Sequence, residues 1–145
     1  MSNICLIGCV KRKRSKPCAA VDMYISPLFR LRLRYAQKLG MKCYIISAKY
    51  GLLEPQTIIA PYNATLKDMT SRERKMWAIR VIQELERREK IGRGGGVLVL
   101  AGKEYRQYLA RFYRVSYPFG GMKFGQQLQQ LNREAKFQKY AEVHL

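Results

Sequence analysis

The sequence predicts an α/β protein of three layers, α/β/α, in which a four-stranded parallel sheet lies between helices. Four short segments are apolar along most of their length, which is typical of parallel strands buried on both faces. Helical patterns separate these segments along the chain, and that alternation favours a parallel sheet. With 145 residues, the chain is expected to form one domain, residues 1–145, around a single core.

The first half of the chain predicts two strands and one helix. The first strand is the apolar segment 3–9, and a basic loop follows it. Ser26 and Pro27 predict a helix start, because serine is a common N-cap and proline is favoured at the first helical position. This helix is expected to end at Gly40, and the segment 41–47 to form the second strand.

The second half continues the alternation. Thr70 and Glu73 have the spacing of a capping box and predict a helix that runs to about Lys90. The glycine-rich segment 92–96 then leads into the third strand. The remaining expected elements are the third strand "VLVLAG", a helix "KEYRQYLARFY", a fourth strand "RVSYPF" and a closing helix "GMKFGQQLQQLNREAKFQKYAEV".

The segment 47–69 is expected to be a long connection without regular structure. It contains prolines, a glycine, tyrosines and a lysine, and it has neither a helical nor an alternating period. Irregular connections of about 20 residues are uncommon in compact domains unless they have a function. In parallel α/β sheets ligands bind beyond the carboxyl ends of the strands. We therefore expect the connections 9–26, 47–69 and 102–106, which leave those ends, to converge on one site.

The charge of the chain indicates a polyanionic partner. Twenty-eight Lys and Arg against ten Asp and Glu give a net charge of +18, and such an imbalance is typical of proteins that bind polyanions. We expect DNA as the partner, with RNA as the weaker alternative, and a monomeric protein. A membrane surface is not expected, because no segment pairs a long apolar stripe with a basic face.

Basic residues near the predicted site are candidates for nucleic-acid binding, although a basic segment can also be a solvated surface. The segment 11–16 is the densest of these and lies beside the expected ligand edge of the sheet. The expected nucleic-acid-binding residues are Lys11, Arg12, Lys13, Arg14, Lys16, Lys67, Arg72 and Lys123.

The remaining composition indicates a cytoplasmic protein without a metal or cofactor. The apolar N-terminal segment has no basic region before it and no cleavage site after it, so we interpret it as a strand, not a signal peptide. The four cysteines form no C-x-x-C pair, and they are expected to be reduced thiols. The single histidine, His144, lies far from the strand ends in the sequence, which argues against a Ser-His-Asp triad and against a structural zinc site.

Three polar residues are candidates for catalysis. Asp22 is a carboxylate among many cations, so it is expected to stay ionised and to position water or stabilise a cation, or else to pair with an arginine. Lys49 can bind phosphate or protonate a leaving group, or it is one more solvated cation. Asn63 can hold a water or read a base edge, or it is an ordinary turn residue.

Residues near the strand ends are expected to form a pocket for a base. Tyrosines there can stack on a base, with packing in the core as the alternative. The expected pocket residues are Cys9, Tyr24, Ser26, Ser47, Tyr50, Gly51, Tyr62, Gly102 and Tyr105.

Several of these motifs together resemble a known family. The segments "CVKRK", "AAVDMYISPLFR", "SAKYGLLEP", "PYNATL", "LAGKEY" and "GMKFGQQLQQL" resemble a family of small bacterial and phage proteins catalogued as a domain of unknown function, from Cys9 to Leu131. The order cysteine, lysine, tyrosine, serine after the first strand also resembles the core motif of archaeosine synthase, which modifies a deazaguanine base in transfer RNA.

Both groups resemble the uracil-DNA glycosylase superfamily, whose fold is a four-stranded parallel sheet between helices. In that superfamily an Asp or Asn after the first strand positions water. In the family that this chain resembles, an acid often stands at the position of Asn63, so the resemblance leaves Asp22 and Asn63 as alternatives for this role.

The resemblance implies a hydrolase, a DNA N-glycosylase that acts on a modified base and leaves an abasic site. Some phage-defence glycosylases that excise glucosylated hydroxymethylcytosine from phage DNA are similar in size and basicity. The alternatives are a deazaguanine-type enzyme that modifies a base in RNA or DNA, and a nucleic-acid-binding protein without chemistry.

Overall fold

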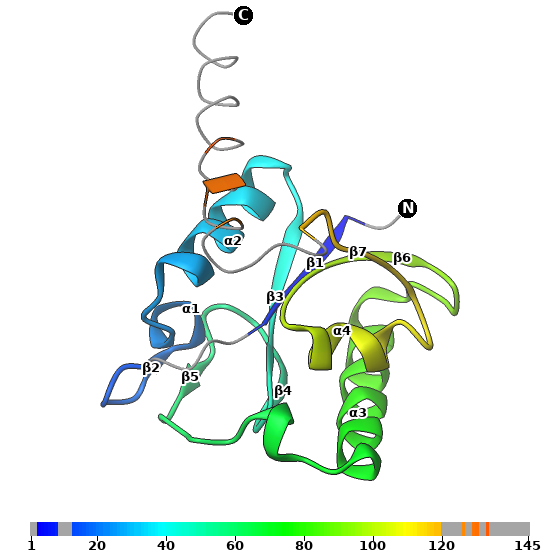
Figure 1. Cartoon of the computed structure of the whole chain (residues 1–145), viewed down its shortest axis with the longest axis horizontal. Helices are drawn as coiled ribbons and strands as arrows, with labels where there is room; N and C mark the ends of the chain where they lie inside the picture. The colour runs from blue at the N-terminus through cyan, green and yellow to red at the C-terminus, as the bar shows by residue number, and fades with distance from the viewer. Residues whose placement is uncertain (1–2, 9–12, 120–125, 127–128, 131–132, 134–145) are drawn as a thin grey trace, which may run out of the picture.

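The computed structural model describes residues 3–8, 13–119, 126, 129–130 and 133, and it centres on a five-stranded sheet (Figure 1). The order of the strands across the sheet is β4-β3-β1-β6-β7. Their bounds are Ile4–Gly8 for β1, Lys42–Ser47 for β3, Gly51–Leu53 for β4, Gly96–Leu100 for β6 and Arg114–Ser116 for β7.

Four of these strands are parallel, as the sequence predicts. β1 pairs in parallel with β3 and with β6, and β7 pairs in parallel with β6. The prediction of a sheet with only four strands is wrong, because β4 adds an antiparallel strand at the edge beside β3. Gly51 allows this reversal: its φ of +73° lies in the left-handed region, and the chain turns back so that Ser47 pairs with Gly51. The fold is therefore mixed α/β with a mainly parallel sheet.

Helices lie on both faces of the sheet. Successive side chains of a strand point to opposite faces, and β1 divides its apolar residues accordingly. Ile4 and Leu6 pack in a core cluster with α3 and α4, whereas Cys5 and Ile7 pack in a second cluster with α1 and α2. Figure 1 shows the two pairs of helices on opposite sides of the sheet. The helices are α1 (Ala20–Met23), α2 (Pro27–Lys38), α3 (Ser71–Glu89) and α4 (Lys103–Leu109).

The helix ends follow the signals in the sequence. The Ser26 hydroxyl accepts a hydrogen bond from the Leu28 amide at 3.2 Å and caps α2. Thr70 and Glu73 form both hydrogen bonds of the capping box at the start of α3. Lys90 ends α3 in a left-handed conformation. Most of the predicted closing helix lies outside the described residues, and the four residues that are described, 126, 129–130 and 133, are helical.

The connection 47–69 is more ordered than expected. Besides β4 it contains the two-residue strand β5 (Ile58–Ile59) and a 3₁₀ helix, η1 (Leu66–Asp68). β5 pairs in antiparallel fashion with β2 (Cys18–Ala19), which lies in the connection after β1. Buried backbone groups need hydrogen-bond partners, and each of the two connections supplies partners to the other. The expectation of a connection without regular structure is therefore wrong.

Three of the four cysteines are described. Cys5, Cys18 and Cys43 are free thiols, and Cys5 is buried in the sheet; Cys9 lies outside the described residues. Within the ranges given above, no helix is both long enough and apolar enough to cross a membrane.

Gly8 allows β1 and β6 to end in close contact. A Cβ atom at Gly8 would stand 2.4 Å from Ala101 Cβ, a separation that real Cβ atoms do not adopt. Gly102 offers a comparison, since a Cβ there would meet, among the residues described, the Glu104 carboxylate at 3.4 Å and the Tyr105 ring at 3.8 Å.

We expect Gly8→Ala to lower the free energy of unfolding by about 1–3 kcal/mol, because the added methyl group overpacks the contact with Ala101. Gly102→Ala is the control at an exposed position; because Gly102 is the N-cap of α4 and alanine is less favoured there, this variant should lower the free energy of unfolding by about 0.5–1 kcal/mol. Urea denaturation of the two variants measures the difference. Equal stabilities would contradict the close contact.

Candidate functional site

The connections after β1 and β3 are joined at the carboxyl edge of the sheet. Beyond the pairing of β2 with β5, the Ala20 amide donates to the Thr57 carbonyl at 2.8 Å, and the Val21 amide donates to the Pro55 carbonyl at 2.9 Å. The start of α1 is thereby fixed to the connection after β3. Two of the three connections that were expected to converge therefore do so.

Three hydroxyl groups form a buried chain between these connections, and we call Tyr24, Ser47 and Tyr62 the hydroxyl network. The Ser47 hydroxyl donates to the Tyr62 phenol oxygen at 2.8 Å, and the phenol oxygens of Tyr62 and Tyr24 are 2.7 Å apart. Ser47 has no exposed surface, and Tyr62 is 8% exposed. Buried hydroxyl groups are almost always hydrogen-bonded, so this network links β3 to both connections.

Ser47 uses its full hydrogen-bonding capacity in the network. A serine hydroxyl has one proton and two lone pairs. The proton goes to Tyr62, and the oxygen accepts from the Lys49 amide at 3.2 Å and from the Tyr50 amide at 3.0 Å. The role of Ser47 in this geometry is to hold the turn between β3 and β4.

An aromatic edge with two lysines lies beside the network. The Tyr50 ring meets the Tyr62 ring edge-on with centroids 5.5 Å apart, and the Tyr50 phenol donates to the Ala60 carbonyl at 3.3 Å. Lys13 Nζ lies 4.5 Å from the centroid of the Tyr62 ring, and Lys49 Nζ lies 5.2 Å from that of Tyr50. Ammonium groups bind ring faces at such distances, so the two lysines and the two rings form one surface.

Two of the predicted catalytic residues, Asp22 and Asn63, are exposed. Asp22 is an exposed residue of α1, and Asn63 is exposed directly after Tyr62. Arg14 Nε donates to the backbone carbonyl of Asp22 at 2.8 Å. This contact fixes the backbone at Asp22 and is not the ion pair considered as its alternative role.

Two of the predicted pocket residues have local structural roles. Ser26 caps α2 through its hydroxyl group. Gly51 forms the reversal into β4, and a Cβ there would stand 3.2 Å from Arg80 Nε.

The third connection, residues 102–106, contacts the hydroxyl network through Trp77. Tyr105 packs edge-on against Trp77 with ring centroids 5.3 Å apart, in the cluster on the α3 and α4 face of the sheet. Trp77 Nε1 donates to the Ser47 backbone carbonyl at 2.8 Å. Gly102 is the exposed residue before α4. The predicted pocket residues are therefore divided between the two faces of the sheet.

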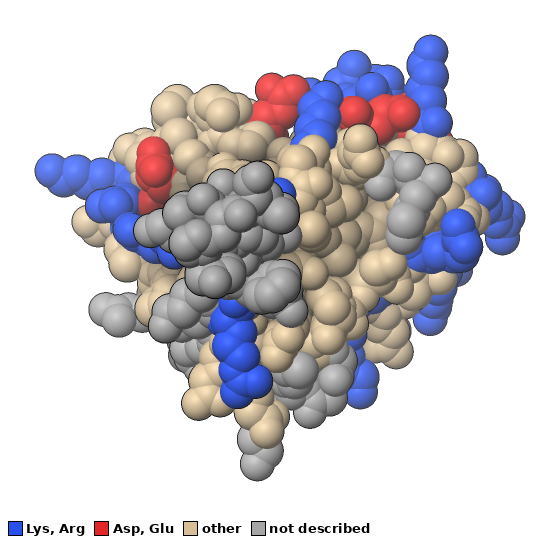
Figure 2. All heavy atoms as spheres, turned by 90° about the horizontal axis from the view of Figure 1, so that it is seen from above, with Lys and Arg blue, Asp and Glu red and all other residues tan. Residues whose placement is uncertain are grey.

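The predicted nucleic-acid-binding residues are only partly described. Arg14, Lys16, Lys67 and Arg72 are exposed, whereas Lys11, Arg12 and Lys123 lie outside the described residues, as does the predicted pocket residue Cys9. In the view of Figure 2, Lys and Arg side chains lie at several places along the outline of the molecule and are not confined to one patch.

Two arginines of α3 pair with a carboxylate of the same helix. Arg87 and Arg88 hydrogen-bond to the Glu84 carboxylate, and these contacts lower the pKa of Glu84 to about 2.

A second group of polar side chains at the carboxyl edge was not predicted. Arg106 Nε donates to the Ala101 carbonyl at 3.1 Å, and its guanidinium lies 3.6 Å from the centroid of the Tyr117 ring. Arg32 of α2 is only 4% exposed. Burial lowers the pKa of Arg32, and a hydrogen bond with Tyr117 opposes that shift. The sequence carries a signal for Arg32, since it occupies the apolar face of α2 between Leu28 and Ala36.

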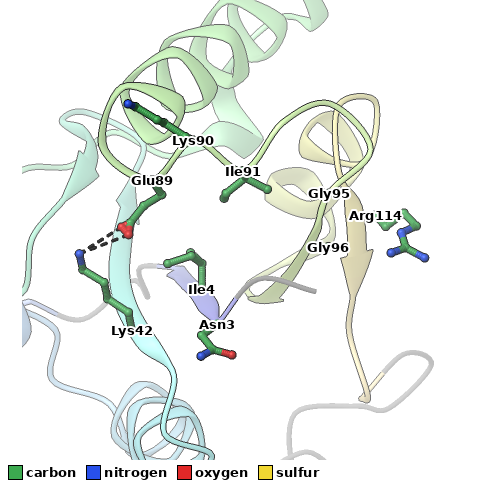
Figure 3. Close-up of a pocket in the computed structure, with 9 residues that line it drawn as sticks. All are labelled: Asn3, Ile4, Lys42, Glu89, Lys90, Ile91, Gly95, Gly96 and Arg114. Carbon is green, nitrogen blue, oxygen red and sulfur yellow. Dashed lines mark hydrogen bonds and ion pairs between the residues drawn. The ribbon is translucent and has the colours of Figure 1, made fainter.

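A cavity of about 490 Å³ lies at the opposite edge of the sheet, where the parallel strands begin. Lys42, at the start of β3, forms an ion pair with Glu89 at 3.1 Å on one side of this cavity. Figure 3 shows the Lys42 amine turned toward Glu89, while the side chains of Lys90 and Arg114 point away from each other. The cations that line this cavity therefore do not converge on a common point.

The described residues show no cluster of His, Cys, Asp and Glu side chains that suits a metal ion. The fold and the carboxyl edge together define a basic, mixed α/β protein with two joined connections beyond a mainly parallel sheet. The chain belongs to the family of unknown function DUF6884, whose model matches residues 4–133. It is also similar to the uncharacterized protein YfjM of Bacillus subtilis (strain 168), with 29% identity over 92% of this chain and 95% of the relative.

The hydroxyl network makes a prediction for stability. Tyr62→Phe should lower the free energy of unfolding by about 1–3 kcal/mol, because the hydroxyl groups of Ser47 and Tyr24 lose a buried partner. Tyr108→Phe is the control: Tyr108 is similarly buried at 6% exposure, and its phenol makes no hydrogen bond to a described residue. Denaturant unfolding compares the two variants, and an equal loss in both would show that the network contributes nothing specific.

Proposed function

We propose that this protein is a DNA glycosylase that hydrolyses the N-glycosidic bond of a modified base, such as glucosylated hydroxymethylcytosine in phage DNA, and leaves an abasic site. The observation that carries the proposal is the joining of the connections after β1 and β3 at the carboxyl edge, where α/β sheets bind ligands. The net charge of +18 supports a polyanionic substrate. The resemblance to the uracil-DNA glycosylase superfamily supports the reaction type.

The substrate base must leave the DNA stack before it can react. Glycosylases flip the target nucleotide into a pocket, and the half-buried Tyr50, which packs on Tyr62, offers ring surface beside the joined connections. In this proposal the connection 47–69 forms the wall that receives the flipped base.

The glycosidic bond breaks through an oxocarbenium-like sugar, which must be stabilised and then attacked by water. Asp22 or Asn63 positions the water, and both side chains are exposed to an incoming substrate. The DNA phosphates and the Asp22 carboxylate stabilise the cation. Lys49 is the better donor to the departing base, because the Tyr50 phenol already donates to Ala60. No step requires a metal or cofactor, and we expect a monomer to act on phage DNA in the cytoplasm.

The direct test is release of a base. The protein is incubated with DNA that contains uracil, hydroxymethylcytosine, glucosylated hydroxymethylcytosine or a deazaguanine. Mass spectrometry detects the released base, and alkaline cleavage detects the abasic site. Absence of both products with all four substrates would exclude the glycosylase.

Asp22→Ala is expected to lower the rate of base release by about 10²–10⁴-fold, the usual effect of removing a group that activates water. Affinity for DNA should stay near the wild-type value. Asp68→Ala is the matched control, because Asp68 is the other aspartate of the chain and is also exposed, in η1. A large loss in Asn63→Ala with Asp22→Ala unaffected would assign the water to Asn63 instead.

A base-modifying enzyme acting on RNA or DNA is the second candidate, favoured by the resemblance to archaeosine synthase. It predicts a change in nucleoside mass without an abasic site. A binding protein without chemistry predicts instead that alanine at Asp22, Lys49 or Asn63 has no effect, whereas neutralising the segment 11–16 abolishes binding.

A further inference from the structure

The guanidinium of Arg106 is held in one orientation at the carboxyl edge of the sheet. Its Nε donates to the carbonyl of Ala101, directly after β6, and its Cζ lies 3.6 Å from the ring centroid of Tyr117, directly after β7. Neither Nη1 nor Nη2 donates a hydrogen bond to a described residue. The end of the guanidinium that can form paired hydrogen bonds is therefore fixed in position and available to a ligand.

A second guanidinium group, that of Arg32, adds positive charge beside Tyr117. Arg32, from the helix layer on the other face, hydrogen-bonds with the same Tyr117, and the charge of Arg106 acts on it as a like charge. Tyr117 thus stands between two guanidinium groups, one half-buried and one buried. An anion bound beside two cations is attracted by both of them.

The position of this group relates it to the proposed function. β3, β1, β6 and β7 are successive neighbours in the sheet, and adjacent strands lie about 4.8 Å apart. The ends of β3 and β7 are therefore separated by about 14 Å along the same edge. One nucleic-acid strand can reach both the joined connections and Arg106.

We propose that Arg106, oriented by Tyr117 and Ala101 and supported by the charge of Arg32, is a phosphate-binding subsite at the carboxyl edge. Arginine suits this ligand because its planar fork matches two oxygens of a phosphate group. The subsite holds a backbone phosphate of the DNA while the joined connections receive the base, and this source of the phosphate rests on the proposed function. A phosphate monoester offers the same chemistry, and the experiment distinguishes the two sources.

The first measurement is the salt dependence of binding to a DNA duplex. Arg106→Gln should reduce the slope of log K against log salt by about 0.9, the value for one lost phosphate contact. Arg106→Lys keeps the charge, so the slope should stay near wild type while the affinity falls by about tenfold with the loss of the fork. Thermal unfolding of each variant checks that the fold is retained.

Arg111→Gln is the matched control. Arg111 also lies over a tyrosine, 4.7 Å from the centroid of the Tyr108 ring, but it follows α4 toward the start of β7, away from the carboxyl edge. Its slope should equal that of the wild type. Equal slopes in Arg106→Gln and the wild type, or equal losses in Arg106→Gln and Arg111→Gln, would overturn a DNA phosphate subsite at Arg106.

The second measurement separates the subsite from the reaction. Inorganic phosphate and a nucleoside monophosphate are titrated into the protein, and the NMR signal of Arg106 Nε–Hε is followed. A saturable shift supports the subsite, even if no base is ever released and the glycosylase fails. No shift together with an unchanged DNA slope in Arg106→Gln overturns the subsite, even if base release is observed.

Discussion

The structure depends on how its two long connections satisfy their backbone polar groups. A buried amide or carbonyl without a partner is costly, and the connection after β3 avoids this cost by reversing at Gly51 and by pairing with the connection after β1. Ser47 lies at the end of β3, where the connection to β4 begins. Its hydroxyl fixes the turn through two amides and reaches Tyr62 across the connection. The arrangement of the carboxyl edge follows from these hydrogen bonds of Ser47 and from the pairing of the two connections.

Local signals in the sequence were sufficient for the main elements. Three of the four parallel strands, β1, β3 and β6, are short and mostly apolar, and the helix starts at Ser26 and Thr70 are marked by capping residues. The strands β2, β4 and β5 were not predicted, because two or three residues carry no readable period. Their pairing also depends on contacts between segments far apart in the chain, such as Cys18 with Ile59, which no local pattern records.

The candidate site could be located from the sequence, but its arrangement could not. Tyr62 and Tyr105 both lie in connections beyond parallel strands, yet Tyr62 joins the hydroxyl network and Tyr105 packs on Trp77 on the other face of the sheet. The direction of each side chain depends on tertiary packing, which position alone does not give. Arg32 was overlooked because α2 is rich in arginine, although its spacing from Leu28 and Ala36 places it on the apolar face of the helix, unlike its exposed neighbour Arg30.

The edge strands of the sheet influence whether copies of the protein can associate through their sheets. β4 and β7, which form these edges, are each three residues long. Exposed strand margins invite pairing with strands of other molecules, and natural proteins limit this by keeping such margins short. An edge strand of three residues offers few free amides to a strand of another molecule. A net charge of +18 adds repulsion between copies. At high concentration the protein should therefore resist conversion into fibrils through its own sheet.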